Sequence, residues 1–514
     1  MRKFLLTLFL LLNTSPALFC QEVDTIWVKR YNGPANLNDY PSALILDDSG
    51  NIYVTGQSFS YNTGYDYATL KYHPDGELAW LKRYNGTGNY DDGATALALD
   101  GSGNLYVTGW SVGTGTFYNF DYTTIKYQSD GETTWVRRYP GPVENHDDAA
   151  TAITVDSSGN IFVTGHSWDL VTFDDYATFK YYPDGETAWL RRYNGPANGY
   201  DHPKDLSVDP FGNLCLTGLS SSRENGFDYA TIKYYPNGDT AWLRRYNGSG
   251  NSDDDACAIA IDGSGNIYVT GTSYDNFADN DYATLKYYPN GDTAWVRRYN
   301  GTGNSEDQAT DLVLDRFGNI YVTGKSYDSS TYFDYATIKY DSSGNELWVR
   351  RYNGPGNGND EATAIAIDDS GNAYITGKSS GIGTDFDFAT LKYDLSGNLL
   401  WSKRYNGGGY DKPSAIAVDD SGNVFVTGQS YQSETKYDYV TIKYNHIIFH
   451  RGDVNQDGKV SIADIVYLIN YLFKGGPSFY PPASGDCNCD GKVSVSDVVY
   501  LINYLFKGGP PPIC

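Results

Sequence analysis

A segment that the chain repeats eight times constrains its fold more than any other feature. One copy, residues 360–407, reads DEATAIAIDDSGNAYITG, continues through a variable run, and ends DFATLKYDLSGNLLWSKRYNG. One glycine marks each copy, and it recurs at steps of 53, 56, 53, 53, 53, 53 and 51 residues, at Gly56, Gly109, Gly165, Gly218, Gly271, Gly324, Gly377 and Gly428. Copies at so regular a spacing indicate one supersecondary unit stacked on itself.

Each copy contains four short runs that predict β-strands. In the copy quoted above they are residues 363–367, 373–376, 388–393 and 400–405, and Tyr, Val, Ile and Thr dominate in them. The turn sequences DDSGN and DLSGN join the first run to the second and the third to the fourth, which indicates two hairpins. No run has the length or the period of a helix.

The first and fourth runs predict how the strands are ordered in space. The first run is apolar on both faces and thin, with Ala364 and Ala366 on one side, which suits the crowded axis of a radial array. The fourth run carries Lys403 and Arg404, and charge protects an exposed sheet edge from pairing with another chain. We therefore predict a four-stranded propeller blade whose first strand lies at the axis.

The two ends of the repeat array predict how the ring closes. An isolated fourth strand, residues 25–31, precedes the first copy, and the eighth copy stops after its third strand, residues 439–444. If these two strands pair in one blade, the ring has no open edge. The predicted fold is all-β, an eight-bladed β-propeller of four-stranded blades closed by its N-terminal strand.

The motifs AIAxDxSGNxYVTG and DYATxKY resemble the SBBP-type bacterial β-propeller repeat family. The resemblance covers nearly all of residues 23–444. It implies a propeller, but it implies no single activity.

One aspartate stands just before the innermost strand of every copy. The eight are Asp39, Asp92, Asp148, Asp201, Asp254, Asp307, Asp360 and Asp411. They form either a cation-attracting acidic ring near the axis or a set of Asx-type caps, each bonded to its own backbone. Repetition in every blade favours the caps. A second Asp, a Lys and an Arg also recur in every copy, and structural ion pairs explain them best.

A catalytic site should break the eightfold pattern, because chemistry needs one constellation of residues. The six histidines fall in different registers without metal-ligand spacing, so no catalytic residue is assigned. The most variable segments join the second and third strands and are rich in Tyr, Phe, Ser, Asn and Gly, which makes them the expected place for a ligand: residues 58–65, 111–120, 167–174, 220–227, 273–280, 326–333, 379–386 and 430–437. Trp110 and Trp168 flank two of these segments and either stack on a sugar or pack.

Charge and the N-terminus indicate the compartment. The net charge of −25 argues against nucleic acid or an anionic membrane as partner. Residues 1–20 combine a basic start, an apolar run and the small residue Ala17, which is typical of a secretory signal peptide. Cleavage is expected after Ala17 or Cys20, and Phe19 disfavours the alternative of a lipid on Cys20. We expect a secreted protein, either free or associated with the cell surface, without a membrane span.

The expected domains are the signal peptide (1–20), the propeller (21–444), a short linker (445–451) and a C-terminal module (452–514). Cys215 and Cys257 fall on strands of neighbouring blades and are expected to be buried thiols. Cys487, Cys489 and Cys514 cluster at the C-terminus, where one pair can form a disulfide in an oxidising compartment; which pair stays open.

Two calcium loops open the two halves of the C-terminal module. Residues 452–476 read GDVNQDGKVSIADIVYLINYLFKGG, and residues 485–509 read GDCNCDGKVSVSDVVYLINYLFKGG. Loop positions 1, 3, 5, 7, 9 and 12 carry the oxygen ligands that Ca²⁺ prefers: Asp453, Asn455, Asp457, Lys459 (through its carbonyl), Ser461 and Asp464, then Asp486, Asn488, Asp490, Lys492, Ser494 and Asp497. Two copies predict two bound Ca²⁺ ions.

An apolar-striped helix follows each loop, over residues 462–473 and 495–506, and no helix precedes either loop. Residues 452–509 are very similar to a type I dockerin, which implies a cohesin domain of a scaffold or surface protein as partner. Positions 10 and 11, which help to choose that partner, hold Ile462 and Ala463 in one loop and Val495 and Ser496 in the other. Well-known dockerins carry a hydroxyl pair there, so the identity of the partner does not transfer.

Three functions follow from these patterns. The first is a non-catalytic binding or structural propeller attached through the dockerin to a scaffold or cell surface, within a polysaccharide-degrading assembly. The second is a glycosidase or lyase with its site at the propeller axis, which would need two carboxylates that break the repeat; the repeats suggest no such pair. The third is a surface adhesin.

Overall fold

The computed structural model describes residues 20–114, 119–143, 146–223, 226–275, 279–449, 451–479 and 482–512. Contacts divide the chain into two compact units. One unit is Thr25–Tyr444, and the other consists of Asn445–Cys514 together with the residues before Thr25. The expected signal peptide, residues 1–20, lies outside the described residues except for its last position.

Thirty-two strands form eight antiparallel sheets of four strands in the first unit. Blade 1 comprises β2 (Asp39–Leu46), β3 (Ile52–Ser60), β4 (Gly64–Tyr72) and β5 (Leu78–Tyr84). Blades 2 to 7 repeat this plan with β6 (Asp92–Leu99), β7 (Leu105–Val112), β8 (Phe120–Tyr127), β9 (Thr133–Tyr139), β10 (Asp148–Val155), β11 (Ile161–Asp169), β12 (Phe173–Tyr181), β13 (Thr187–Tyr193), β14 (Asp201–Val208), β15 (Leu214–Ser221), β16 (Phe227–Tyr234), β17 (Thr240–Tyr246), β18 (Asp254–Ile261), β19 (Ile267–Tyr274), β20 (Asn280–Tyr287), β21 (Thr293–Tyr299), β22 (Asp307–Leu314), β23 (Ile320–Asp328), β24 (Tyr332–Tyr340), β25 (Glu346–Tyr352), β26 (Asp360–Ile367), β27 (Ala373–Ser380), β28 (Phe386–Tyr393) and β29 (Leu399–Tyr405).

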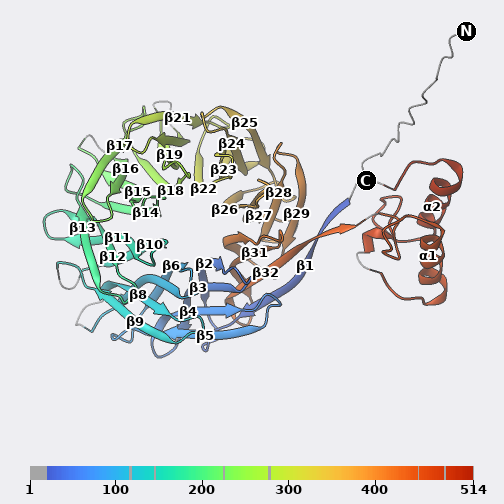
Figure 1. Ribbon diagram of the computed structural model, residues 1–514, viewed down its shortest axis with the longest axis horizontal. Coiled ribbons are helices and arrows are strands. Elements are labelled where there is room, and N and C mark those ends of the chain that lie inside the picture. Colours follow the sequence, from blue (N-terminus) through green and yellow to red (C-terminus); the bar gives the residue numbers. More distant parts are fainter. Residues whose placement is uncertain are drawn as a thin grey trace, which may run out of the picture. The chain divides into compact units, whose positions relative to one another are not determined.

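Blade 8 closes the ring as the strand count predicts. It comprises β30 (Asp411–Val418), β31 (Val424–Gln432), β32 (Lys436–Phe449) and β1 (Cys20–Tyr31), in the order β1-β32-β31-β30. In every blade the first strand lies toward the centre of the ring and the fourth toward its periphery (Figure 1). The predicted eight-bladed propeller with N-terminal closure is therefore confirmed. Strand β32 continues through Phe449, so most of the expected linker, residues 445–451, is strand.

The outer part of each blade is fastened to the next blade by side chains that the repeat supplies. The Trp80 indole donates to the carbonyl oxygen of Ser129 at 3.2 Å, and Lys71 Nζ donates to the same oxygen at 3.1 Å. The buried Tyr67 hydroxyl donates to the carbonyl of Thr123 at 3.2 Å. In other blades the recurring Lys forms the expected ion pair: Lys233 with Asp209 at 2.8 Å, Lys339 with Asp315 at 3.9 Å and Lys392 with Asp368 at 3.8 Å. The recurring Lys thus acts through a carbonyl of the next blade, through an ion pair, or through both.

The second unit contains two helices, α1 (Ile462–Lys474) and α2 (Val495–Lys507), and the short 3₁₀ helix η1 (Pro482–Ser484). Both helices begin at a serine cap and end at a glycine in the left-handed conformation. Buried apolar side chains join the two halves, with Ile465 and Leu468 of α1 in one cluster with Val498 and Leu501 of α2. Each helix thus buries its apolar face against the other, and neither could do so alone.

Candidate functional site

The first candidate calcium loop curls its backbone around carboxylate and amide oxygens. Asp453 accepts hydrogen bonds from the backbone N–H groups of Asp457 at 3.0 Å and Gly458 at 2.9 Å. Asp464 accepts from Asn455 N–H at 3.0 Å and from Ser461 N–H at 2.8 Å. Asp453 and Asp464 are both buried, and the positive φ of Gly458, 85°, makes the turn at loop position 6.

The second loop repeats this geometry almost bond for bond. Asp486 accepts from the N–H groups of Asp490 at 3.1 Å and Gly491 at 3.0 Å, and Asp497 accepts from Asn488 at 3.1 Å and Ser494 at 2.8 Å. The φ of Gly491 is 80°. The two loops therefore place their side chains equivalently, as their sequences predict.

One hydroxyl distinguishes the second loop from the first. Ser496 Oγ accepts a hydrogen bond from Asn488 Nδ2 at 2.9 Å and lies 2.6 Å from Ser494 Oγ. The equivalent position in the first loop is Ala463, which has no hydroxyl. Ser496 therefore connects two loop positions that the first loop leaves unconnected.

The donor sets of both loops fit Ca²⁺. They consist of oxygens alone, from carboxylates, an asparagine amide, a serine hydroxyl and a backbone carbonyl, which is the set that this hard cation prefers. Two of the carboxylates in each loop are buried, and burying charge is costly unless a cation or hydrogen bonds compensate for it. Among the described residues no three or more His, Cys, Asp or Glu side chains group as a metal site, so the fit to Ca²⁺ rests on the mixed oxygen set of each loop.

The four residues at loop positions 10 and 11 begin the helices and face solvent. Ile462 is 59% exposed and Val495 is 51% exposed, and Ala463 and Ser496 are exposed as well. Further exposed apolar residues continue each stripe one and three turns along, at Val466 and Phe473 on α1 and at Val499 and Phe506 on α2. Each helix therefore presents an apolar stripe opposite its buried face.

The cysteines of the C-terminal module have different states. Cys487 is a free, buried thiol, whereas Cys489 is disulfide-bonded. Cys514 lies outside the described residues. In the propeller, Cys215 and Cys257 are free thiols as expected; Cys215 is fully buried and Cys257 is half-buried.

The eight repeated aspartates are buried at the first residue of each innermost strand and do not line an open mouth. Asp39 Oδ2 accepts from Gly33 N–H at 2.7 Å, and equivalent bonds reach Asp92, Asp201, Asp254, Asp307, Asp360 and Asp411. Asp148 accepts no such bond from a described residue. These contacts support the turn-capping hypothesis over the acidic ring.

Burial changes the protonation of these caps. Loss of solvent is the largest influence on Asp39 and raises its pKa to about 6, and it raises the pKa of Asp148 to about 7. The pKa values of the other six are raised for the same reason. Asp39, Asp92, Asp307 and Asp360, with a pKa of about 6, and Asp148, with a pKa of about 7, are therefore partly protonated in mildly acidic solution.

Next to each cap Asp, an Arg–Asp ion pair joins the second, third and fourth strands of the blade. In blade 1 Arg83 donates to Asp66 at 2.7 Å and to the Ser58 hydroxyl at 2.5 Å, and Ser58 is paired with Asp39 across the strands. The same Arg–Asp pair recurs in blades 2 to 7, and Arg30 with Asp438 completes it in blade 8 at 3.2 Å. This recurring pair was expected, and the structure assigns it to blade integrity.

Two carboxylates that break the repeat lie on the innermost strands, and sequence reasoning missed them. Asp205 on β14 and Asp311 on β22 occupy a position where the other six blades have alanine. Each follows a β-bulge, and its carboxylate bonds to backbone N–H groups: Asp205 to Leu206 at 2.8 Å and Ile259 at 2.9 Å. Comparing the eight first strands position by position would have found them.

Burial raises the pKa of Asp205 to about 6 and that of Asp311 to about 7, and the negative charge of Asp205 contributes to the second shift. Asp311 accepts from Leu312 N–H at 2.8 Å and from Ile365 N–H at 2.9 Å, so it bridges blades 6 and 7. Both oxygens of each carboxylate are thus occupied by backbone donors. This arrangement ties neighbouring innermost strands together.

The two tryptophans outside the repeated register are packed against other rings. Trp168 stacks on His146 with ring centroids 3.5 Å apart, and Trp110 lies 4.2 Å from Phe120. Of the two hypotheses for them, packing fits these contacts better. His166 and His202 also meet, stacked at 4.5 Å across blades 3 and 4, and His202 pairs with Asp174 at 2.8 Å.

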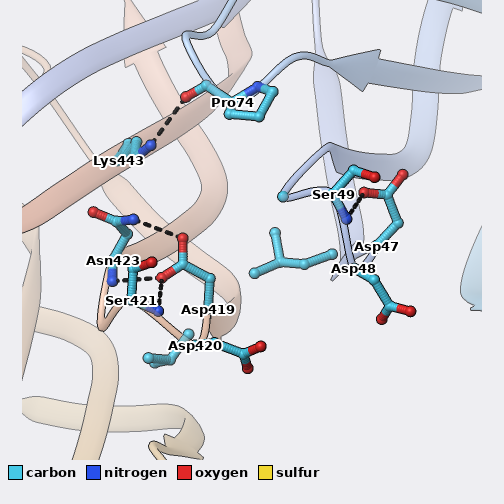
Figure 2. Close-up of a pocket in the computed structure, with 12 residues that line it drawn as sticks. Asp47, Asp48, Ser49, Pro74, Asp419, Asp420, Ser421, Asn423 and Lys443 are labelled. Atoms are coloured by element: carbon cyan, nitrogen blue, oxygen red, sulfur yellow. Dashed lines mark hydrogen bonds between the residues drawn. The ribbon is translucent and has the colours of Figure 1, made fainter.

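On the propeller, a cleft of about 500 Å³ separates the first turns of blades 1 and 8 (Figure 2). Asp47 and Asp419 line it, but both are bonded within their own turns; Asp47 accepts from Ser49 N–H at 3.0 Å and Asp419 from Ser421 N–H at 3.0 Å. Lys443 reaches across to the Pro74 carbonyl at 3.0 Å. The polar groups of this cleft thus serve the turns and the seam.

Comparisons with known proteins agree with this architecture. Residues 451–506 match the dockerin type I domain family, and residues 143–169, 241–278, 294–329, 347–387 and 400–432 match the beta-propeller repeat family SBBP. Type I dockerin domains bind calcium and pair with cohesins. No helix among the described residues is long and apolar enough to cross a membrane.

Individual relatives are distant. An uncharacterized WD repeat-containing protein of Acanthamoeba polyphaga mimivirus is 25% identical over 465 residues, which is 78% of this chain and 30% of that protein. The regulatory protein FlaEY of Caulobacter vibrioides is 27% identical over 170 residues, 28% of this chain and 17% of that protein. The chain thus spans less than a third of either relative.

Among solved structures, a protein of unknown function from Bacteroides caccae matches 61% of this chain and 94% of its own, at 14% identity and a TM-score of 0.33. Likeness at this level carries no argument about function. The repeat motifs, the eight closed blades and the paired loop–helix units define the chain's relationship instead. The chain contains SBBP-type β-propeller repeats and a C-terminal type I dockerin domain.

Proposed function

We propose that this chain is a secreted, non-catalytic propeller that its dockerin attaches to a cohesin-bearing scaffold or cell surface in a calcium-dependent manner. The observation that carries the proposal is the duplicated loop–helix unit with its exposed apolar stripes. An exposed apolar patch on a small domain marks a protein interaction surface. The propeller is then the cargo, held within a polysaccharide-degrading assembly.

Internal symmetry of the dockerin supports two ways of docking. Residues 465–477 and 498–510 agree at 12 of 13 positions, and Ile462 and Val495 are exposed at equivalent places on α1 and α2. If the two segments pack antiparallel, a half-turn of the domain presents almost the same surface to a cohesin. Each of the two loops then holds one Ca²⁺ ion, and Ile462, Ala463, Val495 and Ser496 contact the partner.

The calcium loops give the test of this proposal. Asp464→Ala and Asp497→Ala in the full chain should each leave binding to an array of cohesin domains largely intact, whereas the double variant should abolish it. Measurement is by surface plasmon resonance with and without chelator. Asp48→Ala in an exposed propeller turn is the matched control. Complete loss from one single variant would contradict two-way docking, and no binding to any cohesin would contradict the attachment itself.

Asp205 and Asp311 are the observation that favours the second candidate, a carbohydrate-active hydrolase or lyase. Paired carboxylates near 6 and 7 in pKa resemble an acid–base pair, but their oxygens are bonded to backbone N–H groups. We therefore expect the full chain to release no reducing sugar from polysaccharides. Release that Asp205→Asn or Asp311→Asn abolishes would establish the enzyme instead.

A further inference from the structure

Comparison of the eight blades separates positions that the fold requires from positions that it leaves free. The cap Asp, the Ser paired with it and the Arg–Asp pair recur in every blade. The residue after the cap Asp does not recur at all: it is Tyr40, Gly93, Ala149, His202, Asp255, Gln308, Glu361 or Lys412. Because the blade folds with any of these, a pattern among them reflects something other than folding.

One of these free positions, Tyr40, belongs to a group of aromatic rings at one edge of blades 7, 8 and 1. Six aromatic rings form a continuous series there, with centroids 5.5, 6.3, 5.6, 6.0 and 5.2 Å apart in the order Phe386, Tyr410, Tyr437, Tyr40, Tyr65 and Phe59. We call these six residues the aromatic arc. They come from the start of the first strand, the end of the second and the start of the third, which meet at the same edge of a blade.

Two residues make the arc continuous. Tyr40 of blade 1 touches both Tyr65 of its own blade and Tyr437 of blade 8, and Tyr410 touches both Tyr437 and Phe386. Blade 6 has the same kind of ring pair, Tyr327 and Phe333 at 5.5 Å. In blade 7, the residue equivalent to Tyr40 is Glu361, which has no ring. The blade 6 pair therefore does not extend into the next blade in the same way.

The arc is accessible to a ligand. All six residues are half-buried, and Tyr61, which packs on Phe59 at 6.2 Å, is 74% exposed. Burial, then the neighbouring Tyr65 and Tyr437, raise the pKa of Tyr40 well above its usual range, and burial also raises the pKa of Tyr437. The hydroxyls of these two residues therefore remain hydrogen-bond donors. Gln57, paired with Tyr40 on β3, adds an amide beside them.

Flat rings with neutral hydroxyl and amide groups match the chemistry of a sugar chain. The apolar C–H face of a sugar packs on an aromatic ring, and its hydroxyls bond to phenols and amides. Several rings spread over three blades suit a polymer better than a single sugar. The net charge of −25 disfavours an anionic polymer at the same surface. We infer that the aromatic arc binds a neutral polysaccharide; this inference rests on the proposed function of a binding propeller.

Affinity gel electrophoresis of the full chain tests the inference. The probes are hydroxyethyl cellulose, glucomannan and xylan as neutral polymers and polygalacturonate as an anionic one. At least one neutral polymer should retard the wild type, and Tyr40→Ala and Tyr410→Ala should each weaken that affinity about tenfold, as loss of a central aromatic contact does. Tyr327→Ala, which removes a ring of the separate blade 6 pair, is the matched control and should change it less than twofold.

Three outcomes would overturn the inference: retardation by polygalacturonate alone, retardation by no polymer, or an equal loss in Tyr327→Ala. If Tyr40→Ala or Tyr410→Ala fails to fold, Tyr61→Ala still tests the inference, because the Tyr61 side chain is mostly exposed and its loss should not unfold the blade. Tyr61→Ala should weaken polymer binding about threefold. Polymer binding should also survive chelator. A chain that binds cohesin but no polymer would overturn the arc alone, and sugar release would overturn the non-catalytic function alone.

Discussion

The propeller and the dockerin both bury aspartates, but they stabilise them by different means. In the propeller, Asp39 receives the N–H of Gly33, and Asp66 receives the guanidinium of Arg83. In the dockerin, Asp453 and Asp464 receive backbone and hydroxyl donors from their own loop.

This difference indicates which interactions stabilise each unit. The propeller supplies its own counter-charges, so its fold is complete in the chain. Type I dockerin domains bind calcium, so we expect part of the folding free energy of the dockerin to come from cation binding. Removal of cations should therefore unfold the dockerin and leave the propeller folded.

Calcium removal should have the largest effect and separate the two units completely. With chelator, we expect helices α1 and α2 to unfold, because the loops that cap them lose their ligand, while all eight blades persist. Circular dichroism at helical wavelengths reports the first event. Tryptophan fluorescence reports the second, since all ten tryptophans lie in the propeller. An unchanged helical signal would show that the dockerin folds without the ion.

Loss of Arg30 should open the seam of the propeller. Arg30 on β1 donates to Asp438 at 3.2 Å and Ser430 at 2.8 Å on two other strands of blade 8. Arg30→Ala leaves the buried Asp438 without its counter-charge, which costs about 3–5 kcal/mol of unfolding free energy. Urea denaturation followed by tryptophan fluorescence measures this.

The adjacent Lys29 provides the control for the seam. Among the described residues Lys29 forms one ion pair, with the exposed Glu77 at 3.9 Å, so Lys29→Ala should cost less than about 1 kcal/mol. Equal losses from both substitutions would mean that the ion pair of blade 8 contributes nothing specific to closure.

Mild acid should stabilise the propeller. Burial raises the pKa of Asp39 to about 6, above its value in the unfolded chain, so between pH 4 and 7 the folded propeller binds protons that the unfolded chain has released. The unfolding free energy of the propeller should therefore rise as pH falls from 7 to 5, by roughly 1–3 kcal/mol.

Urea denaturation at several pH values, followed by tryptophan fluorescence, checks this prediction. Asp39→Asn should reduce the pH dependence of the unfolding free energy. A propeller that loses stability steadily from pH 7 to 5 would show that its caps are ionised throughout and well solvated.

Much of the fold is predictable because each copy of the repeat contains the strand and turn sequences of one blade. The eight regularly spaced copies predict the four-stranded blade. The unmatched strands at residues 25–31 and 439–444 predict how the ring closes. The cap aspartates were also predictable, since a residue present in every blade serves what every blade shares. The calcium ligands follow from spacing alone.

The remaining features depend on contacts that one copy does not contain. Asp205 and Asp311 matter because a bulge turns them toward the next blade, and the bulge is not visible in the sequence. Tyr40 and Tyr437 meet only because the ring closes, although nearly 400 residues separate them. The tyrosine-rich segments of the sequence indicate that aromatic residues gather in these loops. They do not show that the rings of the aromatic arc contact one another across three blades.

The smallest expected effect distinguishes the two calcium loops from each other. Ser496 Oγ accepts from Asn488 Nδ2 at 2.9 Å, and Asn488 is a loop ligand, so the hydroxyl holds that amide in place. Ser496→Ala should weaken calcium binding at the second loop by about 1 kcal/mol, or several-fold in affinity. Ala463→Ser, the reciprocal change, should strengthen the first loop by a similar amount if its hydroxyl finds Asn455. Calcium titration of both variants by calorimetry measures the difference. If Ser496→Ala changes the first loop as much as the second, the hydroxyl stabilises the whole domain, and the two loops are not independent sites.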